Sequence, residues 1–498
     1  MADRPRPGQE DGASAEASPG ASGSSAESAA SRQEGHPWGH SLSRRTLLKG
    51  LGLGAVGVSV AALVEACSPA ASTSAAPASA AASAAPASAA ASTAASAAAS
   101  VAASAGTITI GFITPQTGNL AGFASGDGFV VDRVRAADAY AKGFTVGGKT
   151  YDVQIVTADT QSDPNRASQV AQDLILQKNV DMIVTTSTPE TTNPVAQICE
   201  AQGIPCLSTV VPWQAWFFGR QADPANPKPF KYTTMFFFGA ETFGGCFVPM
   251  WNRVTTDKVV AGMFPNDADG NAFRGVWPGV IKQAGYTWLD GGAFPDGTTD
   301  YTAMISKFKQ AKADIFINAP LPPDFNTFWK QAAQQGYKPK LATVAKVLLF
   351  PADTEALGDL VNNIATDCWW GPFMPYKSSL TGETSKQLAD AYQAASGKQW
   401  LQSLGSTYSL FEVAQAAFSA VDDPHAHDAV AAALGKVSYT GICGPLDFTK
   451  GPFPGIGMMR PVGVQWRKGT TYPWEMVVVD NSLNPDVPVG GDLQPTNA

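Results

Sequence analysis

The sequence predicts an α/β fold in two lobes, each a doubly wound parallel sheet with helices on both faces. Short apolar segments alternate with segments of helical periodicity from residue 107 onward, and this order favours parallel strands joined by helices. The alternation forms two successive blocks, one before and one after Tyr232. Residues 107–483 are also more than one hydrophobic core usually accommodates, so two lobes are expected.

The first block opens with a strand at 108–113 that leads into a Pro/Gly turn at 114–119. Apolar residues at helical or alternating spacing predict the elements that follow. These are helices at 130–141, 164–178 and 193–202, and strands at 151–156, 180–184 and 204–208.

The second block repeats this order. It predicts strands at 258–263, 286–290 and 314–318, helices at 272–284, 301–311 and 324–335, and a Gly/Asp-rich loop at 266–271. In such sheets ligands bind beyond the carboxyl ends of the strands. The strand ends of two facing lobes are therefore expected to line a cleft.

Composition excludes several classes of function. Only 15% of the residues are charged and the net charge is −8, so nucleic acid is not expected as a partner. Only His425 and His427 fall in the folded part, which disfavours a histidine-based triad or zinc site. The acidic segment around them, 422–428, is better explained as an exposed helix start than as a metal cluster. We expect no metal and no cofactor.

The six cysteines show no zinc spacing and no C-x-x-C motif. Cys199 and Cys206 are seven residues apart and could form a disulfide after export. The five cysteines beyond Cys67 leave at least one unpaired, so the sequence leaves the pairing open.

The N-terminal region predicts that the protein is exported and held at the cell membrane. Residues 1–35 are expected to be disordered, and 36–66 resemble a twin-arginine signal peptide with Arg44 and Arg45 before a short apolar stretch. Cys67 follows a segment that resembles a bacterial lipobox, so lipidation there would anchor the protein to the outside of the cell membrane. Residues 67–106 are Ala/Ser/Pro-rich and are expected to be a flexible linker.

Several motifs in the folded part resemble the branched-chain amino acid/amide, or Leu/Ile/Val-binding, family of ABC-transporter substrate-binding proteins. The motifs are IGFITPQTGNLA at 110–121, VDMIVTTST at 180–188, GIP at 203–205, GTTDY at 297–301, PDFNTF at 323–328 and GICGPLDF at 441–448. The resemblance implies a type I periplasmic binding protein fold. It also implies a protein that is not an enzyme, binds a small solute between two lobes and passes it to ABC permease and ATPase subunits.

The resemblance further implies three hinge crossings between the lobes. They are expected near 230–233, 369–375 and 441–445, with Trp369 and Trp370 packing in the hinge. Lobe 1 would then comprise 107–231 plus 376–440, and lobe 2 would comprise 232–370 plus 441–483. Residues 484–498 would form a C-terminal tail.

In the family that the sequence resembles, hydroxyls and backbone N–H groups at strand ends of lobe 1 hold a solute's carboxylate or amide, so the resemblance implies ligand contacts there. The matching hydroxyls belong to Ser187, Thr188, Ser208 and Thr209. Ser187 could instead serve as the N-cap of the following helix. Phe123 falls where the family places an aromatic wall, so the resemblance implies that role for it.

Trp213 and Trp216 lie in a very aromatic segment that is expected to be a loop at the end of the strand at 204–208. They are expected either to line the pocket or to pack between the lobes, and the sequence leaves both interpretations open.

Contacts from lobe 2 are expected from Asp267, Asp269, Leu321 and Lys346. The family usually has a Tyr at the position of Leu321 and an acid near 343–347 that pairs with a ligand's ammonium; here Lys346 occupies that stretch. Either the aspartates supply the negative charge, or the solute is an acid or amide without a cationic end. Lys346 could also be a solvated surface residue.

Two other functions remain open at this point. An exported α/β enzyme would use Asp267, Asp269 or Asp300 as an acid–base group. A ligand sensor on the same fold would signal through a partner instead of feeding a transporter.

Overall fold

The computed structural model describes residues 104–223 and 225–496. Two seven-stranded sheets organise this part of the chain, together with a short hairpin of β12 (Ser438–Gly441) and β13 (Gly444–Asp447). The segments predicted as a disordered extension, a signal peptide, a lipidated Cys67 and most of the linker lie outside the described residues.

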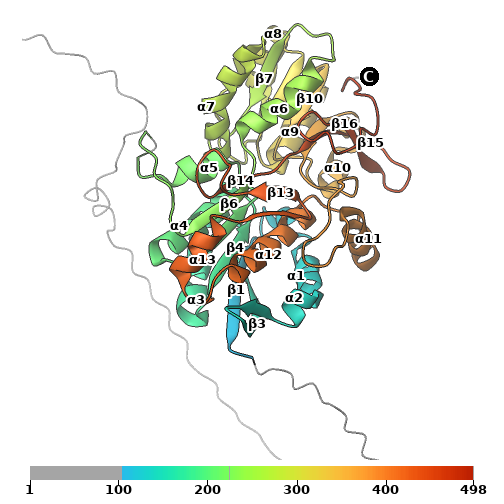
Figure 1. Cartoon of the computed structure of the whole chain (residues 1–498). Helices are drawn as coiled ribbons and strands as arrows, with labels where there is room; N and C mark the ends of the chain where they lie inside the picture. Colours follow the sequence, from blue (N-terminus) through green and yellow to red (C-terminus); the bar gives the residue numbers. More distant parts are fainter. Residues whose placement is uncertain (1–103, 224, 497–498) are drawn as a thin grey trace, which may run out of the picture. The chain divides into compact units, whose positions relative to one another are not determined.

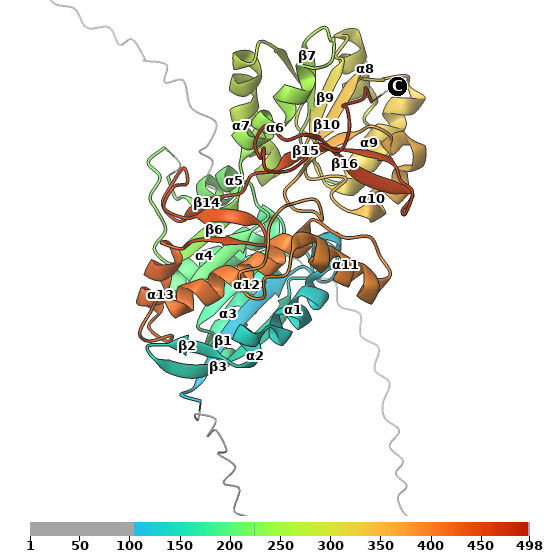
Figure 2. The same cartoon turned by 45° about the vertical axis from the view of Figure 1, so that its right-hand side comes forward.

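The first sheet has the strand order β14-β6-β5-β4-β1-β3-β2 and is parallel except for β2, which pairs antiparallel with β3. Helices cover both faces (Figures 1 and 2). Its strands are β1 (Thr107–Thr114), β2 (Phe144–Val146), β3 (Lys149–Asp159), β4 (Met182–Thr186), β5 (Cys206–Thr209), β6 (Thr233–Phe237) and β14 (Ile456–Met458). Its helices are α1 (Asp127–Ala136), α2 (Asp138–Ala141), α3 (Pro164–Lys178), α4 (Pro189–Gln202), α5 (Trp213–Phe217), α12 (Ser403–Ser419) and α13 (His427–Leu434).

The second sheet has the order β16-β15-β11-β10-β9-β7-β8, in which β15 and β16 alone run antiparallel to their neighbours. Its strands are β7 (Val259–Met263), β8 (Thr287–Asp290), β9 (Ile315–Asn318), β10 (Leu341–Val344), β11 (Ala365–Cys368), β15 (Val462–Lys468) and β16 (Trp474–Asp480). Its helices are α6 (Ala240–Trp251), α7 (Ala268–Gln283), α8 (Thr302–Gln310), α9 (Pro322–Gln334) and α10 (Pro351–Leu357). The remaining elements are α11 (Ser385–Ser396), η1 (Ala121–Ala124), η2 (Phe218–Arg220) and η3 (Gly358–Val361).

The central strands are apolar on both faces because each face is covered by helices. In β1, Phe112 packs into the core that includes α1 and α12, whereas Ile113 packs against α3 and α4. Both side chains are fully buried. This is the near-continuous hydrophobic run expected of a parallel strand with two covered faces, and it confirms the predicted fold class.

Two predicted lobe boundaries are wrong. The first predicted boundary lies between residues 231 and 232, but β6 pairs with β5 and therefore belongs to the first sheet. We placed another at residue 441, but β14, farther along the chain, pairs with β6 in the same sheet. The strands complete the first sheet before the chain leaves it, so the chain passes to the second sheet after β6 and again after β14. It returns between β11 and α12, in a stretch that contains 369–375.

Three local predictions also need correction. The helix predicted at 130–141 is two helices, because the backbone is extended at Ala137. The predicted loop 266–271 contains the start of α7, whose N-cap Asp267 accepts a hydrogen bond from the Gly270 N–H. The aromatic segment that contains Trp213 forms the helix α5.

The segment expected to be a C-terminal tail packs on the second sheet. The Thr496 N–H donates to the Lys340 carbonyl at 2.8 Å, and the Ala342 N–H donates to the Thr496 hydroxyl at 2.7 Å. Val487 is fully buried. Up to residue 496, this segment is therefore part of the second lobe.

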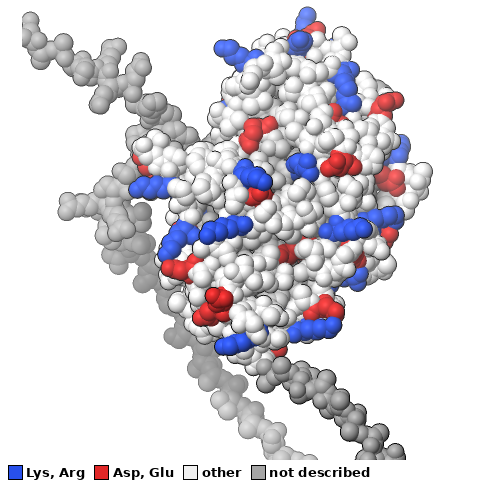
Figure 3. Space-filling view, in the orientation of Figure 1, with Lys and Arg blue, Asp and Glu red and all other residues white. Residues whose placement is uncertain are grey.

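The distribution of surface charge and the composition of the helices were compared with what a charged interface or a membrane span would require. Basic and acidic side chains are scattered over the face shown in Figure 3, and neither kind forms a large patch there. Among residues 104–223 and 225–496, no helix is both long and apolar enough to cross a membrane.

Candidate functional site

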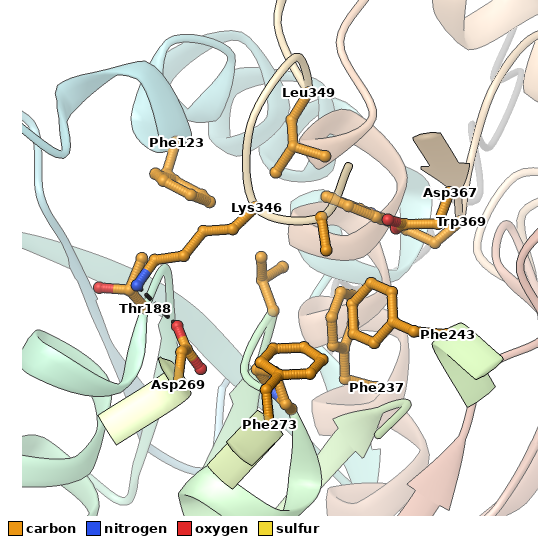
Figure 4. A pocket seen from close by; sticks show the side chains of 13 residues that line it. Phe123, Thr188, Phe237, Phe243, Asp269, Phe273, Lys346, Leu349, Asp367 and Trp369 are labelled. Carbon is orange, nitrogen blue, oxygen red and sulfur yellow. Dashed lines mark ion pairs between the residues drawn. The ribbon is translucent and has the colours of Figure 1, made fainter. Parts of the chain in front are cut away.

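A small cavity of about 30 Å³ lies at the carboxyl ends of the parallel strands of both sheets (Figure 4). The loops that follow β4 and β5 and the last residue of β6 contribute to it from the first sheet; the loop that follows β10 and the end of β11 contribute from the second. Elements η1, α6 and α7 complete the wall. The lining residues are Phe123, Thr188, Val210, Pro212, Phe237, Phe243, Asp269, Phe273, Ala345, Lys346, Leu349, Asp367 and Trp369.

One end of the cavity holds a cluster of charges around Lys346. Its ammonium Nζ lies 2.7 Å from Asp269 Oδ2, 3.1 Å from Asp267 Oδ2 and 3.7 Å from Glu190 Oε1. The Lys346 side chain is only 7% exposed, so the interpretation of Lys346 as a solvated surface residue is wrong. Glu190 is in the first turn of α4, so the cluster connects the first lobe with the second.

Burial and charge act against each other in this cluster. Burial raises the pKa of Asp269 to about 7, more than the nearby Lys346 lowers it. Burial opposes the charge of Lys346, yet the carboxylates of Asp269, Glu190 and Asp267 together keep its pKa well above the ordinary value. Lys346 therefore carries its proton throughout the physiological range.

A second polar group, made by Asp367 and Trp369, lines the cavity away from Lys346 (Figure 4). Asp367 is 1% exposed, and burial raises its pKa to about 7. Its Oδ1 atom and the Trp369 indole N–H are buried without a hydrogen-bond partner among the described residues. We expected Trp369 to pack in the hinge, but it lines the cavity.

The hydroxyls after β4 are also unpaired. Thr188 is the N-cap of α4, yet neither its side chain nor that of Ser187 accepts a capping hydrogen bond. The alternative that Ser187 caps the helix is therefore wrong. Buried polar atoms without partners are rare in folded proteins, and here Thr188 Oγ1, Asp269 Oδ1 and Asp367 Oδ1 all belong to residues of one cavity.

Backbone strain also gathers at these strand ends. Ser187, Val210 and Lys346 have φ angles of 129°, 61° and 66°, values that side chains other than glycine rarely adopt. For Val210, whose side chain is branched at Cβ, the conformation is a clear outlier. Residues held in this way often cluster at ligand-binding positions.

The predicted site residues divide into two groups. Phe123, Thr188, Asp269 and Lys346 line the cavity, and Asp267 contacts Lys346 beside it. The others do not line it; these are Ser187, which is next to Thr188, together with Ser208, Thr209, Trp213 and Leu321.

Packing explains where three of these other side chains lie. Thr209 Oγ1 donates to the Phe236 carbonyl at 2.8 Å, and Trp213 Nε1 donates to Glu241 Oε1 at 2.7 Å. Leu321 is the N-cap residue of α9. Trp213 contacts α6 of the second lobe in this way and therefore packs between the lobes, whereas Trp216 packs on Phe230 and Arg220 within the first lobe. Any contact of these side chains with a ligand stays a prediction.

Sequence reasoning missed much of the aromatic wall. Phe237, Phe243 and Phe273 come from β6, α6 and α7, and no local pattern separates them from the core phenylalanines nearby. Asp367 did have a signal, because it is the one charged residue in the apolar run 364–370.

Two acidic clusters bear on the metal question. Carboxylate oxygens of Glu190, Asp267 and Asp269 lie within 4.8 Å of one another, but the Lys346 ammonium already lies against them. In the segment 422–428, His425 Nδ1 lies 2.7 Å from Asp181 Oδ1, and Asp428 is in the first turn of α13.

The cysteines lie elsewhere. The five cysteines of the described residues are buried free thiols, so Cys199 and Cys206 do not form the disulfide that we considered.

Comparison with known proteins now defines the class of protein. A family model described as periplasmic binding protein matches residues 107–469, and the chain belongs to that family. A curated relative, Leu/Ile/Val-binding protein homolog 7 of Brucella suis, is 26% identical over 245 residues; the match covers 47% of this chain and 57% of the relative.

Solved structures agree on the fold. The branched-chain amino acid transporter substrate binding protein LivJ of Streptococcus pneumoniae, in complex with isoleucine, aligns with a TM-score of 0.58 and 18% identity, over 75% of this chain and 99% of that one. An ABC transporter solute binding protein of Rhodopseudomonas palustris, in complex with 3,4-dihydroxybenzoic acid, aligns with a TM-score of 0.58 and 16% identity, over 78% and 98%. At these identities the likeness concerns the fold, which is the predicted type I periplasmic binding protein fold.

Proposed function

We propose that this protein is the extracytoplasmic solute-binding component of an ABC importer. It captures a small organic solute, such as an amino acid, an amide or a carboxylic acid, and delivers it to permease and ATPase subunits. The observation that carries this proposal is the cavity between the strand ends of two sheets, in which Thr188, Asp269 and Asp367 keep buried polar atoms without partners. A solute would supply the missing partners.

The binding mechanism follows from the arrangement of the cavity wall. Phe123, Thr188 and Val210 come from the first lobe, and Asp269, Lys346 and Asp367 come from the second. A solute that contacts both groups binds the closed arrangement more tightly and shifts the population of molecules toward it. The solute leaves chemically unchanged when the lobes separate.

The relatives support binding without conversion. The similar proteins named above are binding proteins by name, with isoleucine and a hydroxylated benzoic acid as the bound compounds. Asp300, one of the acids of the enzyme alternative, is in a loop outside the cavity and accepts a hydrogen bond from the Thr302 N–H.

A thermal-shift screen tests the proposal. The purified protein is heated with amino acids, amides, urea, carboxylic acids and aromatic acids, and a true solute raises Tm by mass action. Mass spectrometry of the released compound is then expected to show the starting molecule. Recovery of a converted product would overturn the proposal in favour of an enzyme.

We also propose that the protein is exported by a twin-arginine route and anchored by lipid on Cys67. Metabolic labelling with radioactive palmitate tests the anchor, because Cys67→Ala is expected to lose the label while Cys443→Ala keeps it. Replacing both Arg44 and Arg45 with Lys is expected to retain the protein inside the cell. Labelled Cys67→Ala protein would contradict the anchor.

A further inference from the structure

We propose that the cavity selects a small solute that presents N–H donors from an apolar body and carries no carboxylate, as in a protonated amine or a primary amide. This inference rests on the proposed function and names the solute class of the same site. It follows from the hydrogen-bonding groups that the cavity leaves free.

The free groups are mainly acceptors. Asp269 Oδ1, Asp367 Oδ1 and Thr188 Oγ1 are buried in side chains at most 2% exposed, and each lacks a partner among the described residues. Carboxylate oxygens only accept hydrogen bonds when ionised, whereas the Thr188 hydroxyl accepts or donates. A solute that satisfies both aspartates must therefore bring donors.

The basic group of the cavity is already in use. Lys346 is the single basic residue among those that line the cavity. An ammonium has three N–H donors, and carboxylates of Asp269, Asp267 and Glu190 surround the Lys346 Nζ at 2.7, 3.1 and 3.7 Å. A solute carboxylate would have to compete with these neighbours for the same ammonium.

The charge balance favours a cation for the same reason. Three carboxyl groups surround one ammonium, and Asp367 adds a fourth carboxyl to the cavity wall. Placing another carboxylate in this buried site adds like charge that water screens poorly. A protonated amine would balance the excess of negative charge, and an amide would contribute N–H donors without adding any charge to the buried site.

The rest of the wall suits an apolar body. Phe237, Phe243 and Phe273 lie together on one side of the cavity and Phe123 on another (Figure 4). Aromatic faces attract cations as well as apolar groups. The Trp369 indole N–H is the free donor of the wall, and an amide carbonyl would accept from it.

Two matched sets of compounds test the inference by isothermal titration calorimetry at pH 7.5. One set is isopentylamine, isovaleramide, isovalerate and leucine; the other is benzylamine, benzamide, benzoate and phenylalanine. We expect the amine or the amide of one set to bind at least tenfold more tightly than the acid and the amino acid with the same body. Equal or tighter binding of an acid or an amino acid would overturn the inference.

Two variants distinguish recognition of the solute's charge from a non-specific effect of substituting a buried residue. Asp367→Asn is expected to weaken binding of the amine at least tenfold, whereas Lys346→Met is expected to strengthen it. If Lys346 instead held a solute carboxylate, Lys346→Met would abolish binding of the acid, and the inference would fail. Asp353→Asn is the control, since Asp353 has a pKa raised to about 7 by burial but lies on α10 outside this cavity.

The pH dependence of binding to the parent protein tests the same inference, and it can be measured even if Lys346→Met does not fold. Amine affinity is expected to rise from pH 6 to pH 8, as the cavity carboxyls ionise, and the affinity for an acid is expected to fall. Unchanged amine affinity over this range would contradict the inference.

The screen of the preceding section separates the two proposals. A solute with a carboxylate, found there, overturns this inference and leaves the proposed function in place. A solute with N–H donors and no carboxylate supports both. Absence of any solute in the whole screen would count against the proposed function, and this inference would fall with it.

Discussion

The strand ends of the first sheet and those of the second sheet build different halves of one cavity. Thr188, Val210, Pro212 and Phe237 follow or end strands of the first sheet and carry no charge. The second sheet supplies Lys346 and Asp367 from its strand ends and Asp269 from α7. Glu190 is the exception, because it brings a charge from the first lobe to Lys346.

This difference assigns different tasks to the two lobes. Under the proposed function, the first lobe would offer apolar surface and hydroxyls to a solute before closure, without a large desolvation cost. The second lobe holds charges that become effective once water is excluded, because electrostatic interactions strengthen in a medium of low dielectric constant. The four predictions below test this division, starting with the largest expected effect.

Replacing Lys346 tests whether the charges of the second lobe depend on one another. Lys346→Met leaves the carboxylates of Asp267 and Asp269 buried without a counterion, and we expect it to lower the free energy of unfolding by about 3–5 kcal/mol at pH 8. Urea denaturation measures the loss. Lys386→Met is the control, because the Lys386–Asp390 pair is exposed and is expected to cost less than about 0.5 kcal/mol.

The loss in Lys346→Met is also expected to shrink at pH 5, where the carboxyl groups take up protons. A loss below 1 kcal/mol at pH 8 would contradict the interdependence of these charges.

The pH dependence of stability tests the buried carboxyl of Asp367. Its pKa is raised from 3.8 to about 7 by burial, so the folded protein holds this proton more tightly than the unfolded chain. The contribution of Asp367 to stability is therefore fully present below pH 4 and is lost as the pH rises to 7 and above. Ionisation of Asp367 is expected to lower the free energy of unfolding by as much as about 4 kcal/mol. Asp367→Asn is expected to abolish this pH-dependent loss, because asparagine does not ionise.

Thermal unfolding of the solute-free protein at pH 5 and pH 8 is the measurement for Asp367→Asn. The variant is expected to be the more stable protein at pH 8, whereas Asp390→Asn, at an exposed position, is expected to follow the parent protein at both values. Equal stability of Asp367→Asn and the parent protein at pH 8 would show that the ionised carboxylate of Asp367 does not destabilise the fold.

Removing one hydroxyl tests the first lobe. Thr188→Val keeps the shape of the side chain but removes an unpaired Oγ1, and we expect the solute found by the screen to bind about fivefold more weakly, or about 1 kcal/mol. Calorimetry measures this change. Thr192→Val removes another buried, unpaired hydroxyl of α4 outside the cavity and is expected to leave affinity unchanged. Similar losses in both variants would refute a ligand contact at Thr188.

The smallest effect is expected at the one charge that the first lobe contributes. Glu190 is 28% exposed and lies 3.7 Å from Lys346, so Glu190→Gln is expected to change the free energy of unfolding by less than about 1 kcal/mol. Urea denaturation checks this value, with Glu383→Gln as a comparison at the Arg133 ion pair. A loss as large as that of Lys346→Met would mean that the charges of both lobes carry equal weight.

Local sequence signals predicted the parts of the fold that depend on local structure. Helical periodicity predicts the helix at 164–178, which has these bounds in the structure. There Asp163 caps it, Pro164 begins it and Asn179 ends it in a left-handed conformation. The lobe boundaries failed because β6 and β14 join the first sheet through pairing with distant segments, and β14 has only three residues.

The candidate site shows the same division between local and distant information. Thr188 could be predicted because its motif matches a family position at a strand end, whereas Phe243 and Phe273 reach the cavity only through the packing of α6 and α7. Lys346 and Asp269 were both singled out in the sequence, yet their contact joins residues 77 positions apart. No local pattern predicts such a contact.

The left-handed backbone at Val210 has a consequence for anyone who wishes to engineer this protein. Such a conformation stores about 1–3 kcal/mol of strain, which a glycine at this position would release. The same exchange would strip two methyl groups from the wall of the cavity. Val210 is only 5% exposed and packs in the core, so the loss of its side chain is expected to cost at least as much stability as the relief of strain supplies. Glycine at this position would therefore improve neither thermal stability nor solute binding.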